Sequence, residues 1–145
     1  MRRLLFAIAV VTGTPAWAQS PTDFTAVDAA LDACSARRPD NDGASNCMMI
    51  AKDAADRHLN ALYDAALKAV RQPAPDHAPF DPEVPKRLIA AERAWIAFRD
   101  AECSYQSTIA RGGSGEGYAY AACLYAQTRA RVVALASPEA PHNVR

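Results

Sequence analysis

Two clusters of helix-breaking residues divide this sequence into long stretches that contain neither glycine nor proline. The segment 73–85 carries five prolines, and the segment 111–117 carries four glycines. The stretches between and beyond these clusters are rich in alanine, leucine and other good helix formers, whereas proline cannot continue a helix. No stretch shows the alternation of apolar and polar residues that is typical of a half-buried strand. The sequence therefore predicts an all-α protein.

The two clusters also set the expected boundaries of the helices. We expect three long helices, over residues 47–72, about 81–110 and about 118–136. Asp81 is the expected N-cap of the second helix, with Pro82 at its first position. The preceding segment 19–46 predicts one short helix, ended by "RRPDNDGASN". Short connections make neighbouring helices antiparallel, so the predicted fold is a long helical hairpin with a third helix packed beside it, followed by a polar tail at 137–145.

The N-terminus has the three parts of a secretory signal peptide. Arg2 and Arg3 provide the positive charge, residues 4–11 form a short apolar segment, and "AWA" at 16–18 is a small-x-small cleavage site. The apolar segment is too short to span a bilayer. We therefore expect cleavage after Ala18 and an exported protein in the periplasm or outside the cell, with no membrane span.

Removal of this leader leaves about 127 of the 145 residues, enough for one domain with one core. The balance changes from 16 basic and 16 acidic residues to 14 and 16, a formal charge of −2. This balance provides no basic stripe, which argues against a nucleic-acid partner.

The four cysteines of the remaining chain indicate two disulfides, because an even count in an exported protein is typical of a disulfide framework. They form no C-x-x-C pair, and the three histidines lack ligand spacing, so we expect no metal site and no cofactor. Because the second long helix should end where the first and third begin, we favour bridges Cys34–Cys103 and Cys47–Cys123. The local pairing Cys34–Cys47 with Cys103–Cys123 is the alternative.

The segment "AERAWIAFRDAEC", residues 91–103, places two rows of side chains side by side on the second helix. Trp95 and Phe98 belong to a row with three-four spacing, which predicts that they are buried against a partner helix. An apolar row on the first helix, which includes Leu59, is the expected partner. The sequence therefore predicts a core built around Leu59, Trp95 and Phe98.

Arg99 follows the neighbouring row and falls level with Asp56 if the two helices are antiparallel. A guanidinium on the flank of a buried seam needs an acceptor, and a carboxylate suits it well. We therefore pair Arg99 with Asp56 and expect Asn60 and Tyr63 to satisfy the remaining polar groups. A structural clamp is favoured over a catalytic site that would also use Glu92, because the sequence shows no pair of a nucleophile and a base. By their spacing, the acidic residues of the second helix are expected on a solvated surface: Glu92, Asp100 and Glu102.

Three short blocks in this order resemble the LprI family of secreted bacterial lysozyme inhibitors. The blocks are D-x-x-L-N-x-x-Y at 56–63, W-x-x-x-R-D-x-x-C at 95–103, and "CLYAQTRARVVAL" from Cys123. The resemblance covers roughly residues 34–136. It implies an exported, disulfide-bonded helical domain that binds and inhibits a lysozyme and is not an enzyme. It also implies fold-making roles for the motif residues. The family usually has Gln at the position of Glu92, and "RRPDNDGAS" before Cys47 departs from its pattern.

An envelope structural or interaction module without lysozyme activity is the alternative, since a shared fold does not fix function. The segment of an inhibitor that enters a lysozyme cleft must bind next to two carboxylates, one of which is ionised. The loop 111–117 suits this role best, because Arg111 is a cation, Ser114 is a donor and the glycines let the backbone approach closely. Glu116 would repel those carboxylates. The simpler interpretation is that this loop only connects two helices.

Overall fold

The computed structural model describes residues 20, 22–72, 80–110 and 115–137. Within these residues the chain forms four α-helices and no strand, which confirms the all-α prediction. The helices are α1 (Thr25–Arg37), α2 (Asn41–Val70), α3 (Glu83–Ile109) and α4 (Glu116–Ala136). No helix in this part of the chain is long and apolar enough to cross a membrane. The predicted signal peptide and the polar tail beyond Ser137 lie outside the described residues.

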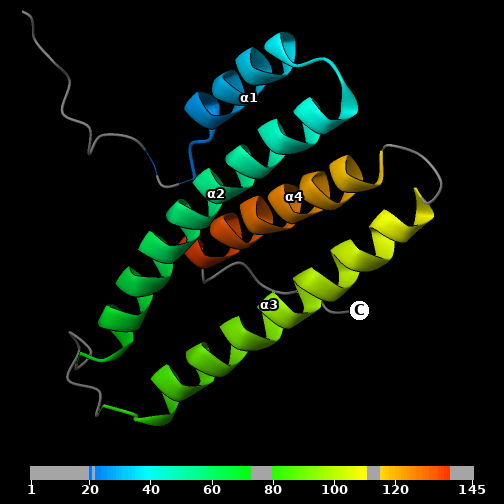
Figure 1. Cartoon of the computed structure of the whole chain (residues 1–145). Helices are drawn as coiled ribbons and strands as arrows, with labels where there is room; N and C mark the ends of the chain where they lie inside the picture. The colour runs from blue at the N-terminus through cyan, green and yellow to red at the C-terminus, as the bar shows by residue number, and fades with distance from the viewer. Residues whose placement is uncertain (1–19, 21, 73–79, 111–114, 138–145) are drawn as a thin grey trace, which may run out of the picture.

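The shortest of the three long helices, α4, lies between α2 and α3 (Figure 1). It packs along α2 and against α3, α1 folds back on α2, and α2 and α3 meet each other over only a few residues. α2 and α3 run antiparallel, as predicted (Figure 1). Most of the packing in the bundle, however, is that of α4 against α2 and α3. Because α4 is shorter than its neighbours, the end of α2 and the start of α3 extend beyond it (Figure 1).

The break between α1 and α2 is much shorter than the sequence suggested. α2 begins at Asn41, six residues before Cys47, because the carboxylate of Asp40 accepts a hydrogen bond from the Gly43 amide at 2.7 Å and caps the helix. Gly43 lies within the helix, where a Cβ atom would stand 2.5 Å from the Cβ of Arg38. This glycine thus allows α1 and α2 to approach closely, and it does not form a loop. The predicted N-cap Asp81 lies one residue too early, because Pro82 occupies the cap position and α3 begins at Glu83; the Asp81 carboxylate accepts a hydrogen bond from the Glu83 amide at 2.8 Å.

The main core lies between α1, α2 and α4. Its buried members are Phe24, Met48, Ala51, Ala55, Leu59, Ala121, Tyr125 and Val132. Leu59 is therefore in the core as predicted, and Trp95 packs half-buried against it. The prediction for Phe98 was wrong, because its side chain is 56% exposed. α3 turns the neighbouring face toward α4, and that face buries Glu92, Cys103 and Ser107.

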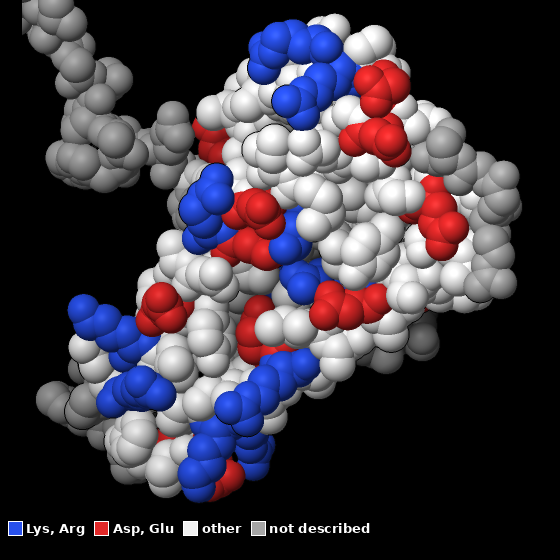
Figure 2. Space-filling view, in the orientation of Figure 1, with Lys and Arg blue, Asp and Glu red and all other residues white. Residues whose placement is uncertain are grey.

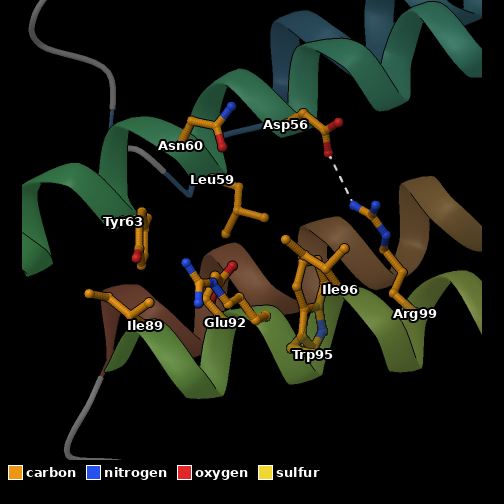
Figure 3. A pocket seen from close by; sticks show the side chains of 10 residues that line it. Asp56, Leu59, Asn60, Tyr63, Ile89, Glu92, Trp95, Ile96 and Arg99 are labelled. Atoms are coloured by element: carbon orange, nitrogen blue, oxygen red, sulfur yellow. Dashed lines mark hydrogen bonds and ion pairs between the residues drawn. The ribbon is translucent and has the colours of Figure 1, made fainter. Parts of the chain in front are cut away.

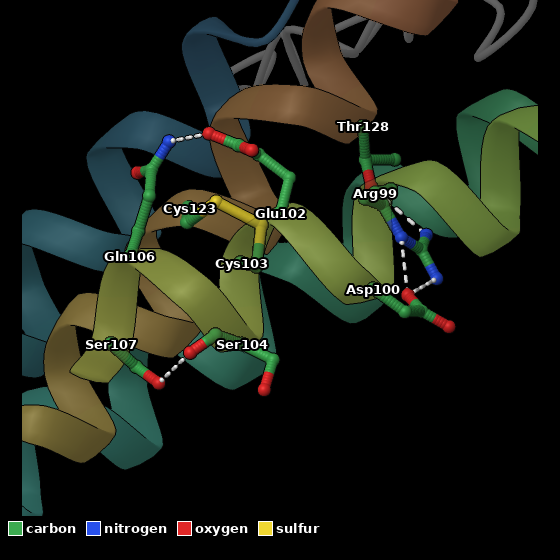
Figure 4. Close-up of a disulfide and its surroundings, with 9 residues drawn as sticks. All are labelled: Arg99, Asp100, Glu102, Cys103, Ser104, Gln106, Ser107, Cys123 and Thr128. Atoms are coloured by element: carbon green, nitrogen blue, oxygen red, sulfur yellow. Dashed lines mark hydrogen bonds and ion pairs between the residues drawn. A yellow bond between two sulfur atoms is a disulfide. The ribbon is translucent and has the colours of Figure 1, made fainter.

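Both disulfides are local. Cys34 pairs with Cys47 and Cys103 pairs with Cys123, so the favoured interleaved pairing was wrong and the alternative is correct; none of the four cysteines is free. The tight turn between α1 and α2 brings the first two Cα atoms within 5.7 Å, and the antiparallel packing of α3 and α4 brings the second two within 5.4 Å. Figure 4 shows the second bridge between these two helices.

Candidate binding pocket between α2 and α3

A pocket of about 410 Å³ opens between α2 and α3, within the size range of small-ligand sites. Leu59 points into this space, with Tyr63 and Ile89 at one end and the Asp56–Arg99 pair at the other (Figure 3). The lining residues are Asp56, Leu59, Asn60, Tyr63, Ile89, Glu92, Arg93, Trp95, Ile96 and Arg99. The two motif blocks on α2 and α3 thus meet at one site.

The predicted partners Arg99 and Asp56 come together at one end of this pocket, with 3.4 Å between Nη1 and Oδ1. The guanidinium also donates to Thr128 Oγ1 at 3.3 Å and to the Asp100 carboxylate at 2.9 Å. Lys52 lies 2.8 Å from the other oxygen of Asp56, and this hydrogen bond raises the pKa of Lys52 above its usual value. Arg99 therefore joins α2, α3 and α4 through one half-buried cluster.

Asn60 and Tyr63 do not take part in this cluster, contrary to the sequence-based expectation. The hydrogen bonds and ion pairs of Asp56 and Arg99 within the described chain go to other residues: Lys52, Asp100 and Thr128. Asn60 is exposed and Tyr63 is half-buried, and both line the pocket further along α2. Both residues thus line the pocket, and neither joins the helices by a hydrogen bond within the described chain.

A second ion pair behind the pocket joins α3 to α4. Arg131 donates from Nε at 3.0 Å and from Nη2 at 2.8 Å to the same oxygen, Oε2 of Glu92. Glu92 is only 7% exposed, so the prediction that it lies on a solvated surface was wrong. Asp100 is exposed, as expected, and Glu102 is half-buried. The burial of Glu92 follows from the position of α4 beside α3, which the sequence did not indicate.

Trp95 links the two ion pairs. The guanidinium carbon of Arg99 lies 5.1 Å from the centre of its ring, and that of Arg131 lies 5.7 Å from it. Both distances are within the range of cation–π attraction. The indole therefore lies between two cations and packs, half-buried, against the core.

The chemistry that the pocket offers is that of a binding site. Its two carboxylates, on Asp56 and Glu92, are already paired with cations. No group of three His, Cys, Asp or Glu side chains that could hold a metal ion occurs in the described part of the chain. Basic side chains gather where α2 ends and α3 begins, and both signs mix over the middle of the molecule (Figure 2). What remains for a ligand is an apolar wall rimmed by Asn60, Tyr63 and Arg93.

A further polar cluster, which sequence reasoning missed, holds α1 on α4. The hydroxyl of Tyr125 donates to the Asp28 carboxylate at 2.7 Å, and Arg129 binds the same carboxylate at 2.8 Å. Arg129 also lies 4.6 Å from the centre of the Phe24 ring. Burial, and then the hydrogen bond to Asp28, raises the pKa of Tyr125 to about 12. Tyr125 and Arg129 belong to the third motif block, but the sequence did not indicate their partner on α1.

The loop proposed from the sequence as a binding element is only partly placed. Arg111 and Ser114 lie outside the described residues. Glu116 is the exposed first residue of α4, where its charge suits the positive end of the helix. The Cys103–Cys123 disulfide ties together α3 and α4, the two helices that the loop connects. The role of the loop in binding therefore stays a prediction.

Comparison with known proteins agrees with the motif resemblance. The family model "Lysozyme inhibitor LprI" matches residues 34–135. An uncharacterized protein, R02472 of Rhizobium meliloti (strain 1021), is 35% identical over 85 residues, which cover 57% of this chain and 61% of that protein. The chain thus spans about three fifths of the length of this relative. No solved structure matches. Because the family model covers most of the chain and all four cysteines, the chain belongs to the LprI lysozyme inhibitor family.

Proposed function

We propose that this protein is an exported binding protein that inhibits a lysozyme by occupying its substrate cleft. The match of the family model over residues 34–135 carries the proposal, because this range includes both disulfides and all of α2 and α3. Two disulfides are also typical of a protein that works in an oxidising compartment outside the cytoplasm. No catalytic step is assigned to the protein.

The loop 111–117 is the proposed inhibitory element. The Cys103–Cys123 bridge restrains the two helices that flank the loop, which reduces the entropy lost when the loop is ordered on a target. Arg111 offers a cation and Ser114 a hydrogen-bond donor to the carboxylates of a lysozyme cleft. Glu116 belongs to α4 and stabilises the start of that helix.

Inhibition of purified lysozymes by the disulfide-bonded protein tests this proposal. The double variant Arg111→Ala, Ser114→Ala should inhibit about tenfold less strongly, equivalent to about 1.4 kcal/mol, with an unchanged melting temperature. Arg71→Ala is the matched control, because it removes an exposed cation next to the end of α2 farthest from the loop. Equal inhibition by the double variant and the control would exclude the loop as the inhibitory element.

An envelope interaction module without lysozyme activity is the second candidate. The observation that favours it is the pocket between α2 and α3, whose unengaged polar groups on Asn60, Tyr63 and Arg93 lie away from the loop. Absence of inhibition by the wild-type protein at about micromolar concentration, the range of a functional inhibitor, would favour this module. Binding assays with envelope fractions would then be compared for wild-type protein and Asn60→Ala, a change of one exposed side chain.

A further inference from the structure

One flank of α3 carries a row of mostly apolar side chains, most of which the described chain leaves exposed. From Val84 to Ile109 the spacing alternates strictly between four and three residues, and only one member of the row is charged. The row consists of Val84, Leu88, Ala91, Trp95, Phe98, Glu102, Tyr105 and Ile109. A strict apolar repeat of this kind, sustained over more than three heptads, is the seam of two packed helices. We call these eight residues the outer row.

The outer row lies on one flank of α3, where Leu88 and Trp95 are half-buried, Trp95 against the core, and the other apolar members are exposed. Four of its members are strongly exposed: Val84 at 43%, Phe98 at 56%, Tyr105 at 63% and Ile109 at 72%. The helix turns the neighbouring face, with Glu92 and Cys103, toward α4. α3 also lies at the edge of the bundle, with α2 and α4 on one side of it (Figure 1). Contacts within the described chain therefore account for the half-buried Trp95 but not for the exposed apolar members of the row.

The exposed area is large enough to contribute to an interface. At ordinary side-chain areas the four strongly exposed residues present roughly 400–500 Å². This is more than half of the roughly 800 Å² that each partner contributes to a standard interface. On the rim of the row, Ala94 and Ala101 are exposed and allow a close approach of a second helix.

We propose that two copies of this protein associate through the outer row, with α3 packed antiparallel against α3 of the second copy. A two-fold axis between Trp95 and Phe98 pairs every member of the row with another member. Trp95 then faces the partner's Phe98, and Leu88 faces the partner's Tyr105. At the ends of the seam, Val84 faces the partner's Ile109. Such a self-complementary interface is the usual form of a symmetric dimer.

The charges on α3 favour the antiparallel orientation. In a parallel pair the two Glu102 side chains would face each other, whereas the antiparallel pair places each one opposite the partner's Ala91. The two Glu102 residues are then about 16 Å apart along the helix axis, at 1.5 Å per residue. Arg87, exposed and without an ion pair in the described part of the chain, comes within one turn, about 6 Å along the axis, of the partner's Glu102. Opposite charges thus meet on the rim of the seam.

Sedimentation equilibrium of the exported, disulfide-bonded protein tests this proposal. The mass should approach twice that of one chain as the concentration rises to roughly 200 µM, a range that detects weak dimers. Phe98→Glu should weaken the dimer about a hundredfold, because it places a carboxylate against the partner's Trp95. Ile50→Glu is the matched control, since Ile50 is 55% exposed but lies on α2, and it should leave the mass unchanged. A monomeric wild-type protein, or equal effects of the two variants, would overturn the proposal.

A charge substitution tests the orientation. Ala91→Lys should tighten an antiparallel dimer several-fold at low salt, because the new ammonium faces the partner's Glu102 at two symmetric positions. In a parallel dimer the two new cations would face each other, so a weaker dimer would overturn the antiparallel arrangement. The proposal does not depend on lysozyme inhibition. If the wild-type protein is monomeric and Phe98→Glu abolishes inhibition, the outer row is a docking surface for the lysozyme and self-association is excluded.

Discussion

Replacing Arg131 with alanine should destabilise the protein by about 3–5 kcal/mol, because the change leaves the Glu92 carboxylate buried without its partner. Glu92 is 7% exposed, and both hydrogen bonds of the guanidinium end on its Oε2 atom. The variant also loses the contact of Arg131 with the Trp95 ring, worth roughly 0.5–1 kcal/mol. Water reaches this carboxylate poorly, so solvation cannot replace the lost partner.

A matched variant separates the unpaired charge from the lost hydrogen bonds. Glu92→Gln retains a carbonyl oxygen at the position of Oε2, and that oxygen accepts both N–H groups of Arg131. The change leaves the Arg131 cation without a counter-charge, but its side chain is 20% exposed and keeps both hydrogen bonds, so we expect a loss of about 1–3 kcal/mol, less than that of Arg131→Ala. The double variant Glu92→Leu, Arg131→Met fills the space with apolar side chains and should be close to the wild-type protein in stability.

Urea unfolding at neutral pH, followed by circular dichroism with both disulfides intact, measures these free energies. Interpretation requires that the slope of the free energy against urea concentration is the same in all variants. If Arg131→Ala costs less than about 1 kcal/mol at an unchanged slope, the Glu92–Arg131 pair behaves as a solvated surface pair. The assignment of this pair to the interior between α3 and α4 would then be refuted.

Three further outcomes are expected. Arg99→Ala should lower the free energy of unfolding by about 1–3 kcal/mol in the same assay, less than Arg131→Ala does. The cost is smaller because Asp56 is 29% exposed and keeps its ion pair with Lys52. Binding by the folded variant should be unchanged. Because the pKa of Tyr125 is raised to about 12, the stability it contributes is complete below pH 10 and is lost from pH 10 to 12. Tyr125→Phe should therefore flatten the alkaline fall of the unfolding free energy. Replacing Cys103 and Cys123 together by alanine should lower that free energy by about 3 kcal/mol.

The helices were predictable where the chain breaks them with proline and glycine. The prolines of 73–85 and the glycines of 111–117 placed the ends of α3 and the start of α4 within about two residues. The start of α2 was predicted too late, because Asp40 and Gly43 belong to residue types that occur both in loops and in helix caps or close contacts. Local sequence does not distinguish these uses, since the deciding contact of Gly43 is with α1.

The candidate site was predictable only as far as it depends on α2 and α3. The antiparallel register alone brought Asp56 and Arg99 together. The buried roles of Glu92 and Thr128 depend on α4, which passes between the other two helices, and no pattern in the sequence indicated that position. The same missing information misplaced Phe98: the three-four spacing identified an apolar row, but spacing does not reveal which surface covers it.

The order in which the cysteines pair has a consequence for how the chain matures. The first cysteine bonds to the second and the third to the fourth, with separations of 13 and 20 residues. A chain that emerges N-terminus first therefore presents Cys34 and Cys47 to an oxidant before Cys103 arrives, and the first bond formed is a native one. Oxidation in order of emergence gives the final connectivity without any exchange between bridges. Maturation of this protein should thus require a thiol oxidase and proceed without a disulfide isomerase.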